Sequence, residues 1–231
     1  MANLFDYVAW RGDISFDTIP FNKIDALLLS HLSYSLLNGL VPSSFEESKT
    51  LSQLSKDFKA ASDYEDRLKI GFVINKNTPE LLAKTAKSLR FKNVRICGYR
   101  EIFSEENVEQ FAAMTYIIKN GKNEEVIISY RGTDDTLVGW KEDFNIVWQD
   151  QIPAQKDALV LDSFAGSGTT AHAVLNMNKA DGGQRRFILI EMMDYADSIT
   201  AERVKRVIQG YGEGNKAMPG TGGSFSYYEL G

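Results

Sequence analysis

The residue types that could do chemistry in this chain gather in one late stretch. An apolar run ends at Asp162, and two glycines one residue apart, Gly166 and Gly168, follow before a helical pattern begins at Thr169. Glycines let the backbone turn sharply and approach a ligand closely, and the first N–H groups of a helix attract polar ligand atoms. The spacing therefore predicts a cradle for a small molecule.

A second acidic residue, Glu191, follows the apolar run Phe187-Ile-Leu-Ile190, which is typical of a buried parallel strand. A strand, a helix and a second parallel strand form a right-handed βαβ unit, so Asp162 and Glu191 should lie at one sheet edge. In nucleotide-type sites an acidic residue there accepts hydrogen bonds from ribose hydroxyls. A ribose-containing ligand is therefore predicted, with a purely structural turn as the alternative.

Local patterns predict the elements that must position this loop. Asn22 is a candidate cap for a helix that carries His31, for which a structural role is expected. Ser44 and Glu47 have capping-box spacing at the start of a second amphipathic helix. Residues 224–230 are expected to form a last strand at an edge or over the site.

The fold predicted from these patterns is α/β. Two β-rich runs, at residues 110–119 and 124–130, are joined by Asn120-Gly-Lys-Asn123, which is typical of an antiparallel hairpin. We expect a three-layer, mostly parallel sheet with helices on both faces and this hairpin near residues 110–130.

Composition limits the function classes. The 231 residues contain 43% hydrophobic residues, no apolar run near the roughly 20 residues of a membrane span, and no N-terminal export pattern. The single cysteine, Cys97, allows no intrachain disulfide, and a cytoplasmic protein without membrane contact is expected. A net charge of −5 disfavours independent DNA binding. The sequence leaves the oligomeric state open.

Residues 1–158 resemble bacterial α/β-hydrolase-like proteins related to class 3 lipases. The resemblance rests on Tyr130 to Phe144, on Trp10-Arg-Gly-Asp13 and Leu29-Ser-His-Leu-Ser-Tyr34, and on Ile152-Pro-Ala-Gln155. It implies that Thr133 lies at an oxyanion hole, where a donor stabilises a tetrahedral intermediate. A polar network that pins this loop is the alternative.

The hydrolase nucleophile is not found in the sequence. Such an enzyme needs a serine on a Gly-x-Ser-x-Gly turn, with an acid and a histidine later in the chain. Ser167 is nearest to this pattern, but Ala165 replaces the first glycine and His172 is only five residues away. We therefore predict no complete hydrolase centre.

Residues 159–231 resemble the C-terminal part of the modification subunit of type III restriction–modification systems, an adenine-N6 DNA methyltransferase. The resemblance is carried by Asp162-Ser-Phe-Ala-Gly-Ser-Gly-Thr-Thr170, Arg185 to Met192 and Gly220 to Leu230. It implies S-adenosylmethionine (AdoMet) as the cofactor. The implied cofactor-binding residues are Asp162, Phe164, Ala165, Gly166, Ser167, Gly168, Thr169 and Glu191.

The target-base motif of these methyltransferases is missing from the sequence. They hold the flipped base with Asp/Asn/Ser-Pro-Pro-aromatic, and none of the five prolines here is adjacent to another. The sequence thus predicts a hybrid of portions 1–158 and 159–231, possibly merged in one sheet, with no complete catalytic site and no metal site. Such a hybrid sequence could arise by natural fusion, by a gene-model error or by deliberate engineering. AdoMet binding, residual hydrolysis and a non-enzymatic scaffold remain as functional hypotheses.

Overall fold

The computed structural model describes residues 3–70, 73–74, 77–104, 109–131, 156–162, 165–214 and 217–229. Its N-terminal elements are α1 (Leu4–Arg11), α2 (Lys23–Leu32), β1 (Lys49–Thr50), α3 (Leu51–Ala60), α4 (Tyr64–Arg67), β2 (Lys69–Ile70), β3 (Val73–Ile74) and α5 (Asn77–Thr85). They are followed by β4 (Arg95–Ser104), β5 (Glu109–Asn120), β6 (Asn123–Arg131), β7 (Leu159–Asp162), α7 (Thr169–Asp181) and β8 (Arg186–Leu189). The last elements are the π-helical segment η1 (Ala196–Ala201), α8 (Glu202–Gln209), β9 (Gly210–Tyr211) and β10 (Met218–Pro219).

The centre of the molecule is a mixed six-stranded sheet with the order β1-β4-β5-β6-β7-β8. The pairs β1–β4, β4–β5 and β5–β6 are antiparallel, whereas β6–β7 and β7–β8 are parallel. The α/β class is therefore confirmed, but the expectation of a mostly parallel sheet is wrong. Short connections return a chain antiparallel to itself, and parallel pairing needs a longer crossover of the kind that α7 supplies.

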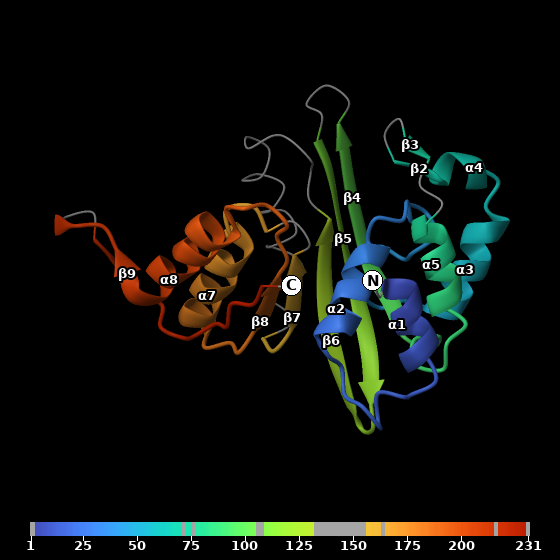
Figure 1. Cartoon of the computed structure of the whole chain (residues 1–231), viewed down its shortest axis with the longest axis horizontal. Helices are drawn as coiled ribbons and strands as arrows, with labels where there is room; N and C mark the ends of the chain where they lie inside the picture. Colours follow the sequence, from blue (N-terminus) through green and yellow to red (C-terminus); the bar gives the residue numbers. More distant parts are fainter. Residues whose placement is uncertain are drawn as a thin grey trace.

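Buried side chains pack on both faces of the sheet. Ile127 and Leu161 contribute to a large cluster with the N-terminal helices, and their neighbours Ile128 and Val160 belong to a second cluster with Val174 of α7. The alternation follows from the two-residue repeat of a strand. Figure 1 accordingly shows α1, α2, α3 and α5 on one side of the strands and α7 and α8 on the other.

Capping side chains fix where the N-terminal helices begin. Asn22 caps α2 through the N–H groups of Ile24 and Asp25, which confirms the sequence prediction. The capping box predicted at Ser44 is wrong, because α3 begins at Leu51 and Thr50 is its cap. The helix starts where its buried stripe starts.

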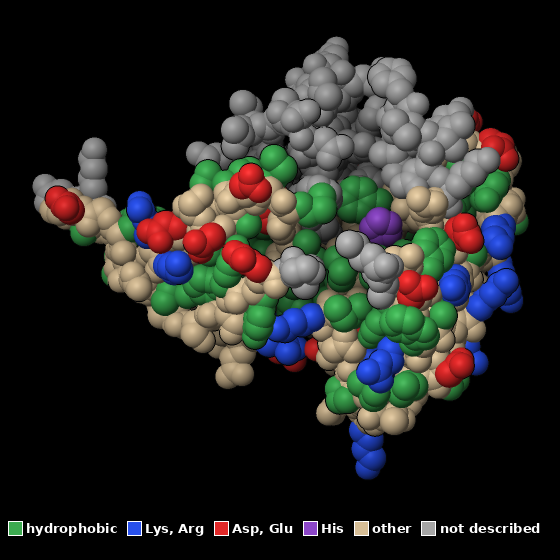
Figure 2. Space-filling model, viewed as in Figure 1, with side chains coloured by type: hydrophobic (Ala, Val, Ile, Leu, Met, Phe, Trp, Pro, Cys, Tyr) green, Lys and Arg blue, Asp and Glu red, His purple; other side chains and the backbone are tan. Residues whose placement is uncertain are grey.

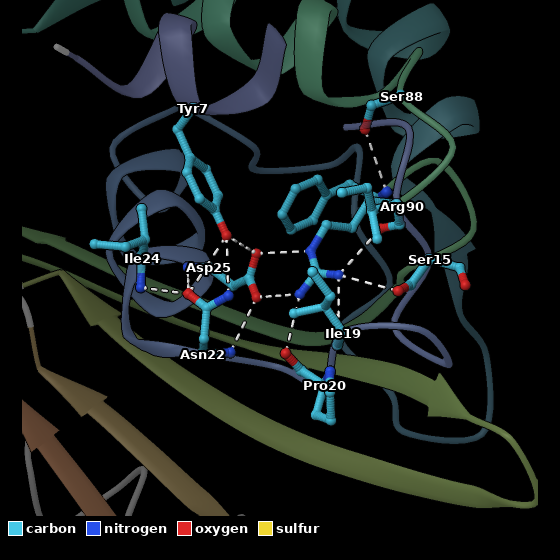
Figure 3. Close-up of polar contacts among 11 residues, drawn as sticks. Tyr7, Ser15, Ile19, Pro20, Asn22, Ile24, Asp25, Ser88 and Arg90 are labelled. Atoms are coloured by element: carbon cyan, nitrogen blue, oxygen red, sulfur yellow. Dashed lines mark hydrogen bonds and ion pairs between the residues drawn. The ribbon is translucent and has the colours of Figure 1, made fainter. Parts of the chain in front are cut away.

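A buried ion pair ties α2 to the segment after α5 (Figure 3). The guanidinium of Arg90 donates to both carboxylate oxygens of Asp25, at 2.9 and 2.5 Å, and both side chains are almost fully buried. Its remaining donors reach backbone carbonyls of residues 14–20, while the Tyr7 hydroxyl donates to Asp25. Both carboxylate oxygens of Asp25 and all three guanidinium nitrogens of Arg90 thus have hydrogen-bond partners despite their burial.

The C-terminal tail does not form the predicted strand. Residues 221–229 are irregular, and Gly222 and Gly223 have positive φ angles of 73° and 96°. Phe225 packs on the cluster formed by α7 and α8, and the Lys23 ammonium lies 3.2 Å from the centroid of the Tyr228 ring. Local contacts with helices therefore replace strand pairing.

Candidate functional site

The loop between β7 and α7 is a tight glycine turn at the carboxyl edge of the parallel strands. Gly166 and Gly168 have φ angles of 50° and 78°, in the left-handed region that favours glycine. A Cβ added to Gly168 would lie 3.0 Å from the carbonyl oxygen of Thr200. Both glycines are therefore required by backbone conformation, and Gly168 also by close packing.

The first helix turn of α7 has free donors. Among the described residues no side chain caps the helix at Gly168, and the N–H groups of Thr169 to Ala171 have no acceptor within the helix. The positive end of the helix dipole reinforces their attraction for negative groups. A carboxylate or another anionic group would be stabilised at this position.

Asp162 lies beneath the loop and is almost completely buried. Its carboxylate accepts a hydrogen bond of 2.5 Å from the Thr170 hydroxyl, in the first turn of α7. The pKa of Tyr130 on the neighbouring strand is raised, first by burial and then by the negative charge of Asp162. In this geometry Asp162 holds the start of the helix in place.

Glu191 links the glycine loop to the turn that follows β8. Its carboxylate accepts hydrogen bonds from the N–H groups of Gly166 (2.8 Å), Met192 (2.9 Å) and Met193 (3.0 Å). A carboxylate has about four acceptor positions, and a side-chain hydrogen bond from Tyr195 takes the one that these three bonds leave. The pKa of Tyr195 is raised, first by burial and then by the charge of Glu191 and this hydrogen bond. The Glu191 side chain is half-buried.

Thr200 and Arg203 hold the loop from the side of η1 and α8. The Thr200 hydroxyl donates to the carbonyl of Gly166 at 2.5 Å. The guanidinium of Arg203 donates to the hydroxyls of Ser167 at 2.9 Å and Thr169 at 3.3 Å. These residues lie more than thirty positions along the chain from the loop, and the single sequence gave no signal for their role.

His172 contacts the same guanidinium. Its Nδ1 lies 3.4 Å from Arg203 Nη2, and its pKa is lowered, first by burial and then by the positive charge of Arg203. Because Arg203 bonds to both Ser167 and His172, the arrangement does not resemble a nucleophile with its general base.

The structure brings together most of the predicted cofactor-binding residues. Gly166, Ser167, Gly168 and Thr169 form the loop and the helix start, with Asp162 beneath them and Glu191 beside them. Ala165 is buried, and its N–H donates to Ile190. Phe164 lies outside the described residues.

The residues implied by the lipase resemblance cannot be placed in the same way. Thr133 and the stretch 132–155 around it lie outside the described residues. His31, for which a structural role was expected, has its Nε2 3.3 Å from the Thr78 hydroxyl, and burial lowers its pKa.

The described residues show few features of a nucleic-acid, metal or membrane site. Lys and Arg side chains lie among Asp and Glu on the face seen in Figure 2. Within the described ranges, no cluster of three or more His, Cys, Asp or Glu could hold a metal ion. No helix in the same ranges is long and apolar enough to cross a membrane.

Comparison with known proteins gives two separate resemblances. The Mbeg1-like family model matches residues 85–183, a stretch that runs across residue 158. The Mod subunit of the type III restriction–modification enzyme StyLTI of Salmonella typhimurium is 44% identical over 71 residues, covering 25% of this chain and 11% of that protein. The type II methyltransferase M.KpnI of Klebsiella pneumoniae is 63% identical over 38 residues, covering 16% of this chain and 9% of that protein.

A third relative is the probable HindVI Mod subunit of Haemophilus influenzae, 45% identical over 74 residues, covering 31% of this chain and 9% of that protein. The chain thus spans only about a tenth of the length of these curated relatives. No solved structure matches. The expected resemblance to restriction–modification methyltransferases is confirmed for part of the chain, and none of these relatives is described as a lipase.

Proposed function

We propose that the β7–α7–β8 unit binds AdoMet. The observation that carries this proposal is the meeting of three features at one sheet edge: the glycine turn, the uncapped start of α7 and the Glu191 carboxylate. The partial similarity to restriction–modification methyltransferases supports the choice of ligand.

The chemistry of AdoMet fits the groups present. Its ribose hydroxyls can donate to Glu191 in place of the Tyr195 hydroxyl, and its amino acid carboxylate suits the N–H groups at the start of α7. Met192 and Met193, which are 78% and 58% exposed, offer apolar surface beside Glu191 for the adenine ring. Asp162 acts from beneath by positioning the first helix turn.

We further propose that this chain binds the cofactor without completing a methyl transfer. The target-base motif needs two adjacent prolines, which the sequence lacks. A hydrolase function for residues 1–158 stays a prediction, since Thr133 lies outside the described residues and no described contact favours it. The hybrid origin of the two portions is likewise a proposal.

Calorimetric titration with AdoMet tests the proposal. Wild-type protein should give a saturable heat, and Gly168→Ala should weaken binding by about tenfold or more, because the new Cβ meets Thr200 and the backbone is strained. Gly182→Ala at the other end of α7 is the matched control. Gly182 has a similar φ of 68° but no atom within 4 Å of an added Cβ, so binding should persist.

A stability measurement gives an independent reading of the same proposal. AdoMet at about one hundred times its dissociation constant should add about 2.7 kcal/mol to the free energy of unfolding. Absence of both the heat and the stabilisation at AdoMet concentrations up to about 1 mM, an affinity limit near −4 kcal/mol, would end the proposal.

A further inference from the structure

The guanidinium of Arg203 has an unusual position. It lies beside the positive end of α7, where it donates to Ser167 and Thr169. No carboxylate within the described ranges forms an ion pair with it. A cation at a helix N-terminus is electrostatically unfavourable, so this corner of the protein gains from an added negative charge.

The same side chain fixes the hydroxyls on either side of Gly168. Arg203 reaches Ser167 and Thr169 with one nitrogen and the His172 ring with the other. A planar guanidinium can make these bonds together, whereas a lysine ammonium is a single point charge. One turn earlier in the chain, Thr200 holds the Gly166 carbonyl.

We propose that Arg203 is a positioning residue for the amino acid end of the cofactor. It holds the loop hydroxyls so that the free N–H groups of α7 stay open to a carboxylate, and its charge strengthens the attraction. It acts on the amino acid end and not on the nucleoside end, where Glu191 lies. This inference rests on the proposed AdoMet binding.

Three ligands separate the two ends of the cofactor. AdoMet and S-adenosylhomocysteine both carry the amino acid carboxylate, and only AdoMet carries the sulfonium charge. 5′-Methylthioadenosine keeps the nucleoside and lacks the amino acid group. A residue that serves the carboxylate should therefore affect the first two ligands and spare the third.

Calorimetry on the full chain provides the test. Arg203→Met should raise the dissociation constants of AdoMet and S-adenosylhomocysteine by about tenfold, and that of 5′-methylthioadenosine by less than about twofold. Arg203→Lys should recover part of the loss. Arg206→Met is the matched control, because Arg206 lies on the same helix and pairs with the exposed Glu202. It should leave all three affinities unchanged.

Other outcomes are equally informative. If Arg203→Met weakens all three ligands alike, or none, the inference is overturned. If that variant fails to fold, Ser167→Ala combined with Thr169→Val removes the hydroxyl partners instead, and the same selective loss is required. Failure of the wild-type protein to bind AdoMet would overturn the proposed function itself, whereas wild-type binding with unselective variants would overturn only the role of Arg203.

Discussion

Some polar side chains of this protein stabilise the fold, and others shape the glycine loop. Arg90 and Asp25 are buried and satisfy each other and several backbone carbonyls, so their contribution is to the fold. Glu191 and Arg203 are only half-buried and each forms hydrogen bonds to the glycine loop, so they shape a site.

Arg90→Lys tests whether the buried Arg90–Asp25 pair stabilises the fold. The substitution removes the forked contact with Asp25 and leaves buried acceptors, namely Asp25 and backbone carbonyls, without hydrogen-bond donors. The free energy of unfolding should therefore fall by about 3 kcal/mol or more. Urea unfolding measures the change. Arg95→Lys, in the exposed pair with Glu124, is the control and should cost less than about 1 kcal/mol. Equal losses would contradict the assignment of Arg90.

The two histidines predict how stability depends on pH. The pKa values of His31 and His172 are both lowered by burial, so the unfolded chain takes up protons first as the pH falls. The free energy of unfolding should therefore decrease from about pH 7.5 to about pH 5.5. Carboxylates such as Asp181, with a pKa of about 2, titrate below this window.

His31→Gln is the variant that checks this prediction, since glutamine does not titrate. Its unfolding free energy, measured with urea across the same window, should depend less on pH than that of the wild type. An equally steep dependence in the variant would show that other groups are responsible.

The sequence predicts the residues of the loop better than the residues that support it. Gly166, Gly168 and Glu191 follow from local signals, namely glycine spacing and the end of a strand. Thr200 and Arg203 contact the loop only through the packing of η1 and α8, which no local pattern encodes. The lone Ser167–His172 spacing gave no hint that an arginine would bond to both.

At the scale of elements, helix starts depend on burial as well as on caps. The chain offers several Ser and Thr candidates before α3, and only Thr50 directly precedes the buried residues Leu51, Leu54 and Phe58. Ser44 instead accepts a local hydrogen bond from the Glu46 N–H. The buried stripe selects among caps that look alike in sequence.

Thr50→Ala and Ser44→Ala form a matched pair that tests this reading. Loss of the Thr50 capping box should lower the free energy of unfolding by about 1 kcal/mol. Ser44→Ala should change it by less than about 0.5 kcal/mol, as for ordinary surface substitutions. Thermal or urea unfolding distinguishes the two, and a larger effect at Ser44 would restore the sequence prediction.

At the scale of the whole molecule, one sheet joins the two predicted portions. β6 pairs in parallel with β7, so Ile127 lies beside Leu159 and Tyr130 beside Asp162. Leu159 and Leu161 also pack in the cluster of the N-terminal helices. The α/β class could be predicted from element order, whereas strand directions depend on which distant strands pair.

This continuity predicts cooperative unfolding. Leu29→Ala in α2 and Leu175→Ala in α7 should each destabilise the protein by about 2–5 kcal/mol and shift one common transition. Circular dichroism and residue-resolved hydrogen exchange should report the same midpoint for both portions. Two separate transitions, one for each variant, would show that the portions fold independently.

Hydrogen exchange with and without AdoMet tests most directly whether the β7–α7–β8 unit binds AdoMet, because it reports both that the ligand binds and which residues it contacts. The amides of residues 166–171 and 191–193 should exchange more slowly with AdoMet, since they form the loop, the helix start and the Glu191 turn. The amides around the exposed Arg206–Glu202 pair should be unaffected. Unchanged exchange in residues 166–171 and 191–193 at saturating AdoMet would contradict the assignment of this edge as the cofactor site.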